Sequence, residues 1–84
     1  MRKPPSPCID VCRYRRAGPA GAHCIACSMT KAQKRLGKAA KGREARRGFV
    51  ALVRAQQTAM GGFEGWRTAY ARKLAKRGMG WDDL

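Results

Sequence analysis

Acidic side chains are the scarcest feature of this chain. Its 84 residues include 5 Asp and Glu and 1 His, against 19 Lys and Arg. General acid–base catalysis needs positioned titratable groups, and an activated nucleophile needs a base beside it. Scattered acids, one His and the lack of a glycine-rich phosphate loop together predict that the protein is not an enzyme.

Long apolar runs are also absent. A transmembrane helix needs about 20 consecutive apolar residues, and no stretch of this chain provides them. The opening, Met-Arg-Lys-Pro-Pro-Ser-Pro, carries positive charge with no apolar segment after it, unlike a secretory signal. We therefore expect a cytoplasmic location, in which thiols stay reduced.

Against these absences stand four cysteines in two close pairs. The pairs are Cys8 with Cys12 and Cys24 with Cys27. Two thiolates from each side of a loop can complete the tetrahedral shell of one metal ion. The second pair has the spacing common at metal-binding turns, whereas the first has one residue more. Small residues and a proline over residues 17–21 predict a chain reversal between the pairs. The sequence thus predicts a metal knuckle over residues 6–29.

Several alternatives to this prediction stay open. The thiols can instead form disulfides or remain free and buried, although a reducing compartment disfavours disulfides. Zinc and iron–sulfur clusters both accept four thiolates, and two pairs across a turn favour a closed structural zinc site. His23 is a possible replacement for a thiolate. Because the neighbour of a ligand usually points away from the ion, we expect His23 to be a solvent-facing loop residue.

The cysteine region is similar to a known family. The matching residues are Ser6-Pro7-Cys8-Ile9-Asp10-Val11-Cys12-Arg13 and Cys24-Ile25-Ala26-Cys27. They resemble the domain of unknown function 1289 family, small bacterial proteins that are labelled predicted iron–sulfur proteins. The resemblance covers roughly residues 6–36 and implies that the four cysteines act together. This chain continues with Ser28-Met29-Thr30-Lys31, where many members have a Thr, an acidic residue and a Trp.

The charge balance predicts the class of partner. The formal net charge is +14, and four thiolates on a divalent ion would leave about +12. Such self-repulsion disfavours a compact chain unless an anionic partner offsets it. Nucleic acid, an acidic protein complex and an anionic membrane surface all fit, and a merely soluble basic surface is the plain alternative.

The bases crowd into one segment. That segment holds Lys31, Lys34, Arg35, Lys38, Lys41, Arg43, Arg46 and Arg47, and the cysteine loop adds Arg13, Arg15 and Arg16. Positions 31, 34, 35 and 38 share one helical face, which can follow the phosphates of a nucleic acid backbone. No helix-turn-helix spacing or RNA-recognition aromatic pattern appears, so we expect contact without sequence readout. Tyr14, beside several arginines, is the aromatic residue most suited to stacking on a base.

Helical signals follow the cysteines. Thr30 with Gln33 forms a capping box at a helix start, and Gly37 and Gly42 predict a break and a restart near Gly42. A central helix is expected to bury Ala45, Phe49, Leu52, Val53 and Met60 and to turn Arg46, Arg47 and Arg54 to solvent. Gly61-Gly62 ends it, and the next helix places Phe63, Trp66, Tyr70 and Leu74 on one face, with Arg67, Arg72, Lys73 and Lys76 elsewhere.

The predicted fold class is small and mainly α. One domain, residues 1–84, is expected to hold the knuckle (6–29), a basic helical region (30–77) and a tail (78–84). The knuckle is followed by two to three helices, and the last two form an antiparallel helical hairpin. Ile9, Ile25 and Met29 are candidates to roof its core. The acidic tail, Trp81-Asp82-Asp83-Leu84, is expected to fray, with a docking peptide or a lid over the basic stripe as alternatives.

These observations favour a zinc-stapled basic module that contacts nucleic acid backbone. An iron–sulfur redox or cluster-handling protein is the second hypothesis, because four thiolates also hold such clusters. The third is a basic accessory subunit that settles on an acidic protein complex or on the membrane surface.

Overall fold

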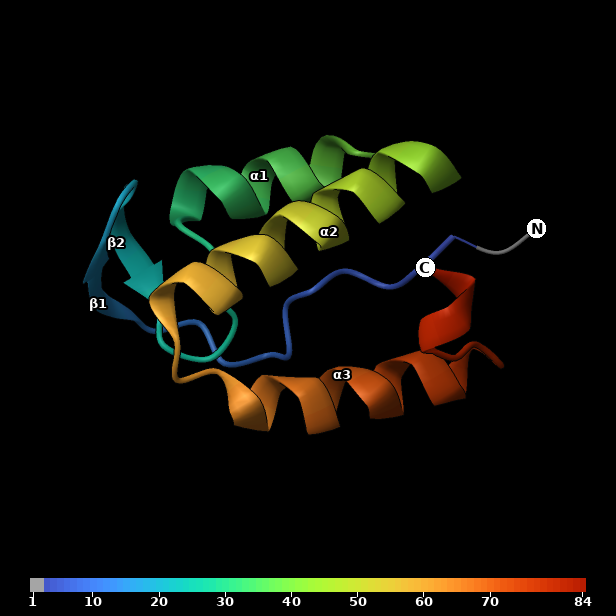
Figure 1. Cartoon of the computed structure of the whole chain (residues 1–84). Helices are drawn as coiled ribbons and strands as arrows, with labels where there is room; N and C mark the ends of the chain where they lie inside the picture. Colours follow the sequence, from blue (N-terminus) through green and yellow to red (C-terminus); the bar gives the residue numbers. More distant parts are fainter. Residues whose placement is uncertain (1–2) are drawn as a thin grey trace.

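The computed structural model describes residues 3–84, which form three α-helices and a two-stranded sheet. In chain order the elements are β1 (Tyr14–Gly18), β2 (Gly21–Cys24), α1 (Lys31–Ala39), α2 (Arg43–Met60), α3 (Glu64–Lys76) and the 3-10 helix η1 (Trp81–Asp83). Figure 1 shows α1 beside α2, α3 opposite them, and the sheet at one end. The mainly helical class is confirmed. Within residues 3–84, no helix is long and apolar enough to cross a membrane.

The two strands form a hairpin between the cysteine pairs. They run antiparallel, with Gly18 opposite Gly21 and Tyr14 opposite Cys24. The predicted reversal over residues 17–21 is therefore confirmed, whereas the strands themselves were not predicted. Gly21 has a φ of 114°, a conformation that glycine adopts without a side-chain clash. The hairpin places Cys24 at the end of β2, next to Tyr14.

Helix α1 begins where its capping residues predict. The Thr30 hydroxyl accepts from the Gln33 N–H at 3.1 Å, and the Gln33 side chain accepts from the Thr30 N–H at 3.0 Å. The restart is also confirmed, because Gly42 is the N-cap of α2. Gly37, however, does not break the helix. It lies inside α1 and is buried against the Phe49 ring, so it is a packing glycine.

Gly37→Ala should destabilise the protein, although alanine favours helices by up to about 1 kcal/mol. A Cβ at this position would lie 2.6 Å from Phe49 Cε2, so the ring must shift. Overpacking costs about 1–3 kcal/mol, and we expect a net loss of about 1–2 kcal/mol in urea unfolding. Gly48→Ala in α2 is the control. A Cβ there meets no atom within 4 Å, so this variant should gain about 0.5–1 kcal/mol. Equal gains from both variants would contradict the packing.

Helix α2 buries only part of the predicted stripe: Phe49 and Val53 are buried as predicted, and Met60 is partly buried. The buried positions are Arg46, Phe49, Val50, Val53 and Gln57. Arg46, Val50, Val53 and Gln57 are spaced by four, three and four, as one helical face requires. Leu52 lies off this face and is 52 % exposed, and Ala45 is exposed, so both were predicted wrongly as core.

Helix α3 follows the sequence closely. Phe63, Trp66, Tyr70 and Leu74 are all buried, as predicted. Gly61 caps the end of α2 with a φ of 74°, and Gly62 follows with a φ of 82°. The two glycines thus end α2 and let the chain reverse into α3.

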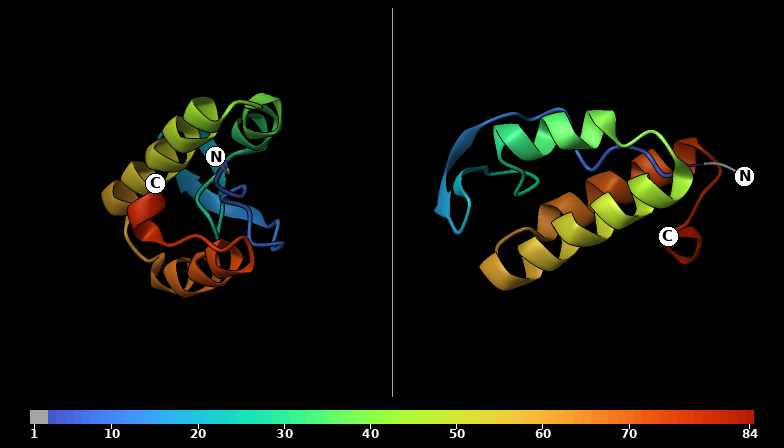
Figure 2. Two further views of the ribbon diagram at one scale, coloured as in Figure 1. Left: turned by 90° about the vertical axis from the view of Figure 1, so that its right-hand side faces the viewer. Right: turned by 90° about the horizontal axis from the view of Figure 1, so that it is seen from above.

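The N-terminal segment runs between α2 and α3, an arrangement that no sequence pattern predicts. In Figure 1 this blue segment passes lengthwise between the two helices, and the end-on view in Figure 2 shows it in the space among α1, α2 and α3. We call residues 3–8 the proline strap. Pro4, Pro5 and Pro7 are fully buried in it. Because proline has no N–H, the strap can offer mainly carbonyl acceptors to its surroundings.

Side chains of α2 and α3 supply the matching donors. The Tyr70 hydroxyl donates to Pro5 O at 2.6 Å, and Trp66 Nε1 donates to Pro7 O at 2.8 Å. The remaining donations run from Arg46 to Pro4 O, from Lys73 to Ser6 O and Cys8 O, and from Arg77 to Lys3 O. The directly packed hairpin of α2 and α3 is therefore not confirmed, because the strap lies between these helices.

The tail is folded back, contrary to the predicted fraying. Trp81 lies 6.1 Å from Trp66 and 5.7 Å from Tyr70, measured between ring centroids. Leu84 packs against the core, and Asp83 accepts from the Gly80 N–H at 2.8 Å. Met29 joins the same core from the cysteine region and Ile9 packs at its edge, whereas Ile25 is exposed. One cluster thus connects the cysteines, the helices and the tail.

Candidate metal centre and nucleic-acid interface

The four cysteines lie in two close pairs, at the end of the strap and at the end of the hairpin. The sulfurs of Cys8 and Cys12 are 3.9 Å apart. In a tetrahedral zinc site with Zn–S bonds of about 2.3 Å, neighbouring sulfurs lie about 3.8 Å apart. Cys8, Cys24 and Cys27 are buried, and Cys12 is exposed. The first pair therefore already has the spacing of two ligands to one ion.

Backbone N–H groups point at three of the sulfurs in a repeated pattern. Cys24 Sγ accepts from the N–H of Ala26 at 3.4 Å. The backbone N–H groups of Asp10 and Met29 likewise act to lower the pKa of Cys8 and Cys27, against the larger effect of burial. Each donor lies two residues after its cysteine. Hydrogen bonds of this kind favour the thiolate over the thiol, which is the form that binds metals.

Two strained residues accompany this pattern. Asp10 has a φ of 67° and Ser28 a φ of 73°, and neither is glycine. A residue held in the left-handed region costs about 1–3 kcal/mol, and such residues concentrate at functional sites. The Asp10 N–H is the backbone group that acts to lower the pKa of Cys8. Ser28 immediately precedes Met29, whose N–H acts to lower the pKa of Cys27. The strain thus lies where the backbone turns toward a sulfur.

Helix side chains hold the backbone of both cysteine segments. Gln57 of α2 donates to Cys27 O at 3.0 Å, and Gln56 donates to Ser28 O. Lys73 of α3 donates to Cys8 O. Because each segment is tied to a different helix, bringing the cysteine pairs together also fixes α2 relative to α3. The sequence did not indicate these anchors, since glutamine and lysine on a helix usually face solvent.

The thiols differ in acidity. Burial raises the pKa of Cys27 to about 12, with further contributions from the sulfurs of Cys24 and Cys8, and burial also raises the pKa of Cys8. The Lys34 ammonium lowers the pKa of Cys12. Burial acts to raise the pKa of Cys24 as well, but backbone hydrogen bonds outweigh it and the pKa is lowered. Metal binding would therefore release protons from Cys8 and Cys27.

Two of the sulfurs are engaged with other groups. Cys24 Sγ donates to Val11 O at 2.9 Å, and Lys34 Nζ donates to Cys12 Sγ at 2.9 Å. Among residues 3–84, no three His, Cys, Asp or Glu side chains are arranged as they stand to hold a metal ion. The donor set nevertheless fits a four-thiolate metal in sulfur count, in the spacing of the Cys8–Cys12 pair and in the backbone donors. Binding would require the Cys24 side chain to lose its proton and turn away from Val11 O, whereas a metal-bound Cys12 thiolate can still accept from Lys34.

His23 is not the solvent-facing loop residue that the sequence predicts. Its ring is completely buried. Nε2 accepts from the Ala20 N–H at 3.1 Å, which leaves Nδ1 to donate to Ser28 O at 2.6 Å. With both nitrogens engaged, His23 joins the hairpin turn to the strained Ser28 and is not available as a ligand in this arrangement.

The predicted basic face gathers around one open pocket. Its lining residues are Cys12, Tyr14, Lys31, Lys34, Arg35 and Lys38, and its volume is about 320 Å³. We call this pocket the basic groove. Lys31 Nζ lies 5.6 Å from the centre of the Tyr14 ring. The groove therefore combines four cations, one aromatic face and one cysteine sulfur.

Two of the predicted nucleic-acid contacts, Arg46 and Arg16, have their side chains engaged within the protein. The Arg46 side chain is 9 % exposed and donates to Pro4 O and Ala40 O. Arg16 donates to Met60 O and Gly61 O at the end of α2, where a cation complements the helix dipole. Their donors hold the strap and the hairpin in place.

The other predicted basic contacts lie around the groove or beyond it. Arg13 and Arg15 are exposed on the hairpin side, and Lys41 is exposed after α1. Arg43 and Arg47 are half-buried in the first turns of α2. None of these five lines the basic groove, so they can at most extend it.

Comparisons with known proteins add no assignment: no family model, no curated protein and no solved structure matches the chain. The resemblance to the domain of unknown function 1289 family accordingly stays a prediction, and the functional argument depends on the residues described above.

Proposed function

We propose that Cys8, Cys12, Cys24 and Cys27 bind one structural zinc ion, and that the fold so stapled holds nucleic acid backbone in the basic groove. In this proposal zinc has a structural role, because it links the two cysteine pairs and takes no part in a reaction. The supporting observations are the paired sulfurs, the backbone donors directed at them and the helix anchors behind them. A chain of this size has little surplus stability, so a metal staple is physically reasonable.

One observation carries the link between metal and partner. Lys34 lies in the basic groove and donates to Cys12 Sγ. The same sulfur that would bind metal thus orients a cation that would bind phosphate. Arg35 and Lys38 continue along the face, and Tyr14 offers a ring on which an unpaired base can stack. Because these contacts are made to phosphates and to the face of a base, we propose that binding is largely independent of the nucleic acid sequence.

Binding to a labelled single-stranded DNA of mixed sequence should be strongly salt-dependent. If six phosphates of the single strand are neutralised, log K falls with log salt at a slope of about −4. Lys31→Gln combined with Lys38→Gln should reduce the steepness by about 1.4, because two counterions fewer are released. Arg72→Gln with Lys76→Gln, which removes two exposed charges from α3, is the matched control and should leave the slope unchanged.

The outcomes separate the partner classes. A flat salt dependence, or equal effects of the two double variants, would contradict the groove as a nucleic-acid site. Copurification from cell extract adds a second test. A partner that stays bound after nuclease treatment would favour an acidic protein complex, whereas its loss would support nucleic acid.

A further inference from the structure

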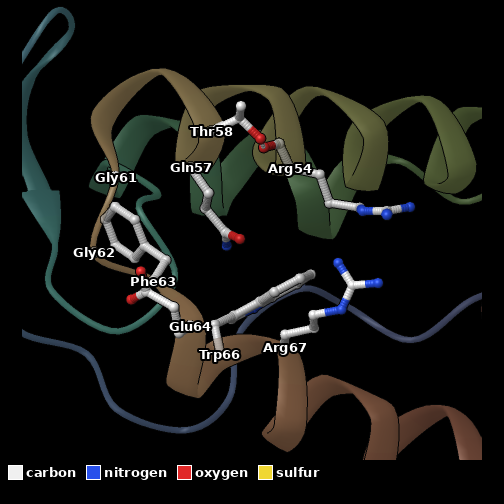
Figure 3. A pocket seen from close by; sticks show the side chains of 9 residues that line it. All are labelled: Arg54, Gln57, Thr58, Gly61, Gly62, Phe63, Glu64, Trp66 and Arg67. Carbon is white, nitrogen blue, oxygen red and sulfur yellow. Dashed lines mark hydrogen bonds between the residues drawn. The ribbon is translucent and has the colours of Figure 1, made fainter.

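A second open pocket lies where α2 passes into α3, away from the basic groove. Its volume is about 350 Å³. Figure 3 shows its lining residues, which are Arg54, Gln57, Thr58, Gly61, Gly62, Phe63, Glu64, Trp66 and Arg67. The α2 wall contributes Arg54, and the first turn of α3 contributes Arg67. Neither the metal proposal nor the groove uses this pocket.

Two arginines face each other at one end of the pocket. Figure 3 shows the guanidinium groups of Arg54 and Arg67 extending toward the same space from opposite helices. Both also contact Trp81, at 5.0 Å and 5.1 Å from their carbon Cζ to the ring centroid. Among residues 3–84, no carboxylate pairs with either of them. Two like charges thus share one indole ring, an arrangement that an anion between them would stabilise.

The remaining lining residues leave that end free for an anion. The Glu64 carboxylate would oppose anion binding, but in Figure 3 it points to the opposite end of the pocket. Gln57 Nε2 is engaged with Cys27 O, and the Thr58 hydroxyl donates to Arg54 O. The guanidinium N–H groups are therefore the main donors that face a bound molecule.

We propose that this pocket binds a phosphate monoester between Arg54 and Arg67. A guanidinium presents a planar fork of N–H donors that matches two phosphate oxygens, so two arginines suit a dianionic terminal phosphate. The open volume beyond the arginines leaves room for the group that carries the phosphate. That carrier is either a small molecule, such as a mononucleotide, or the phosphorylated end of a single-stranded nucleic acid.

The test measures binding at constant ionic strength by isothermal titration calorimetry. The probes are inorganic phosphate, adenosine monophosphate, and one short oligonucleotide in 5′-phosphorylated and 5′-hydroxyl forms. Arg54→Gln with Arg67→Gln should weaken phosphate-monoester binding at least tenfold. Arg72→Gln with Lys76→Gln removes the same charge outside this pocket and should leave binding unchanged.

A second pair of variants keeps the charge. Arg54→Lys with Arg67→Lys should still weaken binding several-fold, because lysine lacks the fork. Lys31→Gln with Lys38→Gln should leave mononucleotide binding intact, which separates this site from the basic groove. Preference for the 5′-phosphorylated oligonucleotide would identify a nucleic acid end, and preference for the mononucleotide a small molecule. Absence of binding to every phosphate, or equal binding by the Arg54/Arg67 and the control variants, would overturn the proposal.

Discussion

Cys12→Ser should lower the melting temperature sharply, although Cys12 is exposed and contributes little packing. If Cys12 is a metal ligand, its replacement weakens metal binding by the remaining three cysteines. A 100-fold loss of metal affinity removes about 2.7 kcal/mol of folding free energy when metal is in excess. For a domain of this size that corresponds to a drop of roughly 11–22 °C. Thermal melts with and without added zinc would measure it.

Exposure of Cys12 is what makes this variant informative. Serine at buried Cys8, Cys24 or Cys27 would destabilise any core, whether or not a metal binds there. At an exposed position, a cysteine without a metal can be replaced at a cost within about 0.5 kcal/mol. Val11→Ser, at the exposed neighbouring position, is the control and should melt near wild type. Equal melting temperatures of Cys12→Ser and Val11→Ser would show that Cys12 is not a metal ligand.

Trp66→Ala should destabilise the protein by about 3–5 kcal/mol, the largest effect expected from a helix residue. The indole is buried, is stacked on Tyr70 at 4.7 Å and donates to Pro7 O. Its removal leaves a cavity at the point where the proline strap meets α3. Urea unfolding followed by far-UV circular dichroism would measure the loss.

The milder variant Trp66→Phe isolates the hydrogen bond. It retains a ring but leaves Pro7 O without its donor, at a cost of about 1–3 kcal/mol. Since Cys8 directly follows Pro7, a loosened strap should also weaken zinc binding in a competition with a chelator. Trp81→Phe, on the half-buried tail, should keep metal affinity unchanged. If Trp66→Phe binds zinc as wild type does, the strap and the cysteine site are not coupled.

Local signals predicted most of the helical structure correctly. Thr30 and Gln33 satisfy each other's backbone donors within one turn, and Gly61-Gly62 needs no distant partner to end α2. The α3 stripe is apolar at every buried position, so its period is plain in the sequence. In α2 the buried face includes the polar residues Arg46 and Gln57. The pattern of apolar residues alone therefore does not identify which face of this helix is buried. The apolar spacing alone favours Leu52 as core, whereas the structure buries Val50.

Long-range partners account for what the sequence did not predict. The strap has no periodicity, and its place depends on donors far away in the sequence, such as Trp66 and Tyr70, which are 59 and 65 residues from the carbonyls they bind. The hairpin strands are short, with two arginines in β1 and small residues in β2, so they lack the apolar alternation that marks a strand. The paired cysteines were recognisable from spacing alone. The Lys73 and Gln57 anchors behind them were not, because they depend on the packed helices.

Native mass spectrometry of anaerobically purified protein tests the central claim most directly, which is that the four sulfurs share one metal. The account predicts one zinc ion per folded chain, and loss of the ion in Cys12→Ser. Iron with sulfide in its place would contradict zinc and support the cluster alternative. Folded protein that carries no metal, even with zinc added, would contradict the account as a whole.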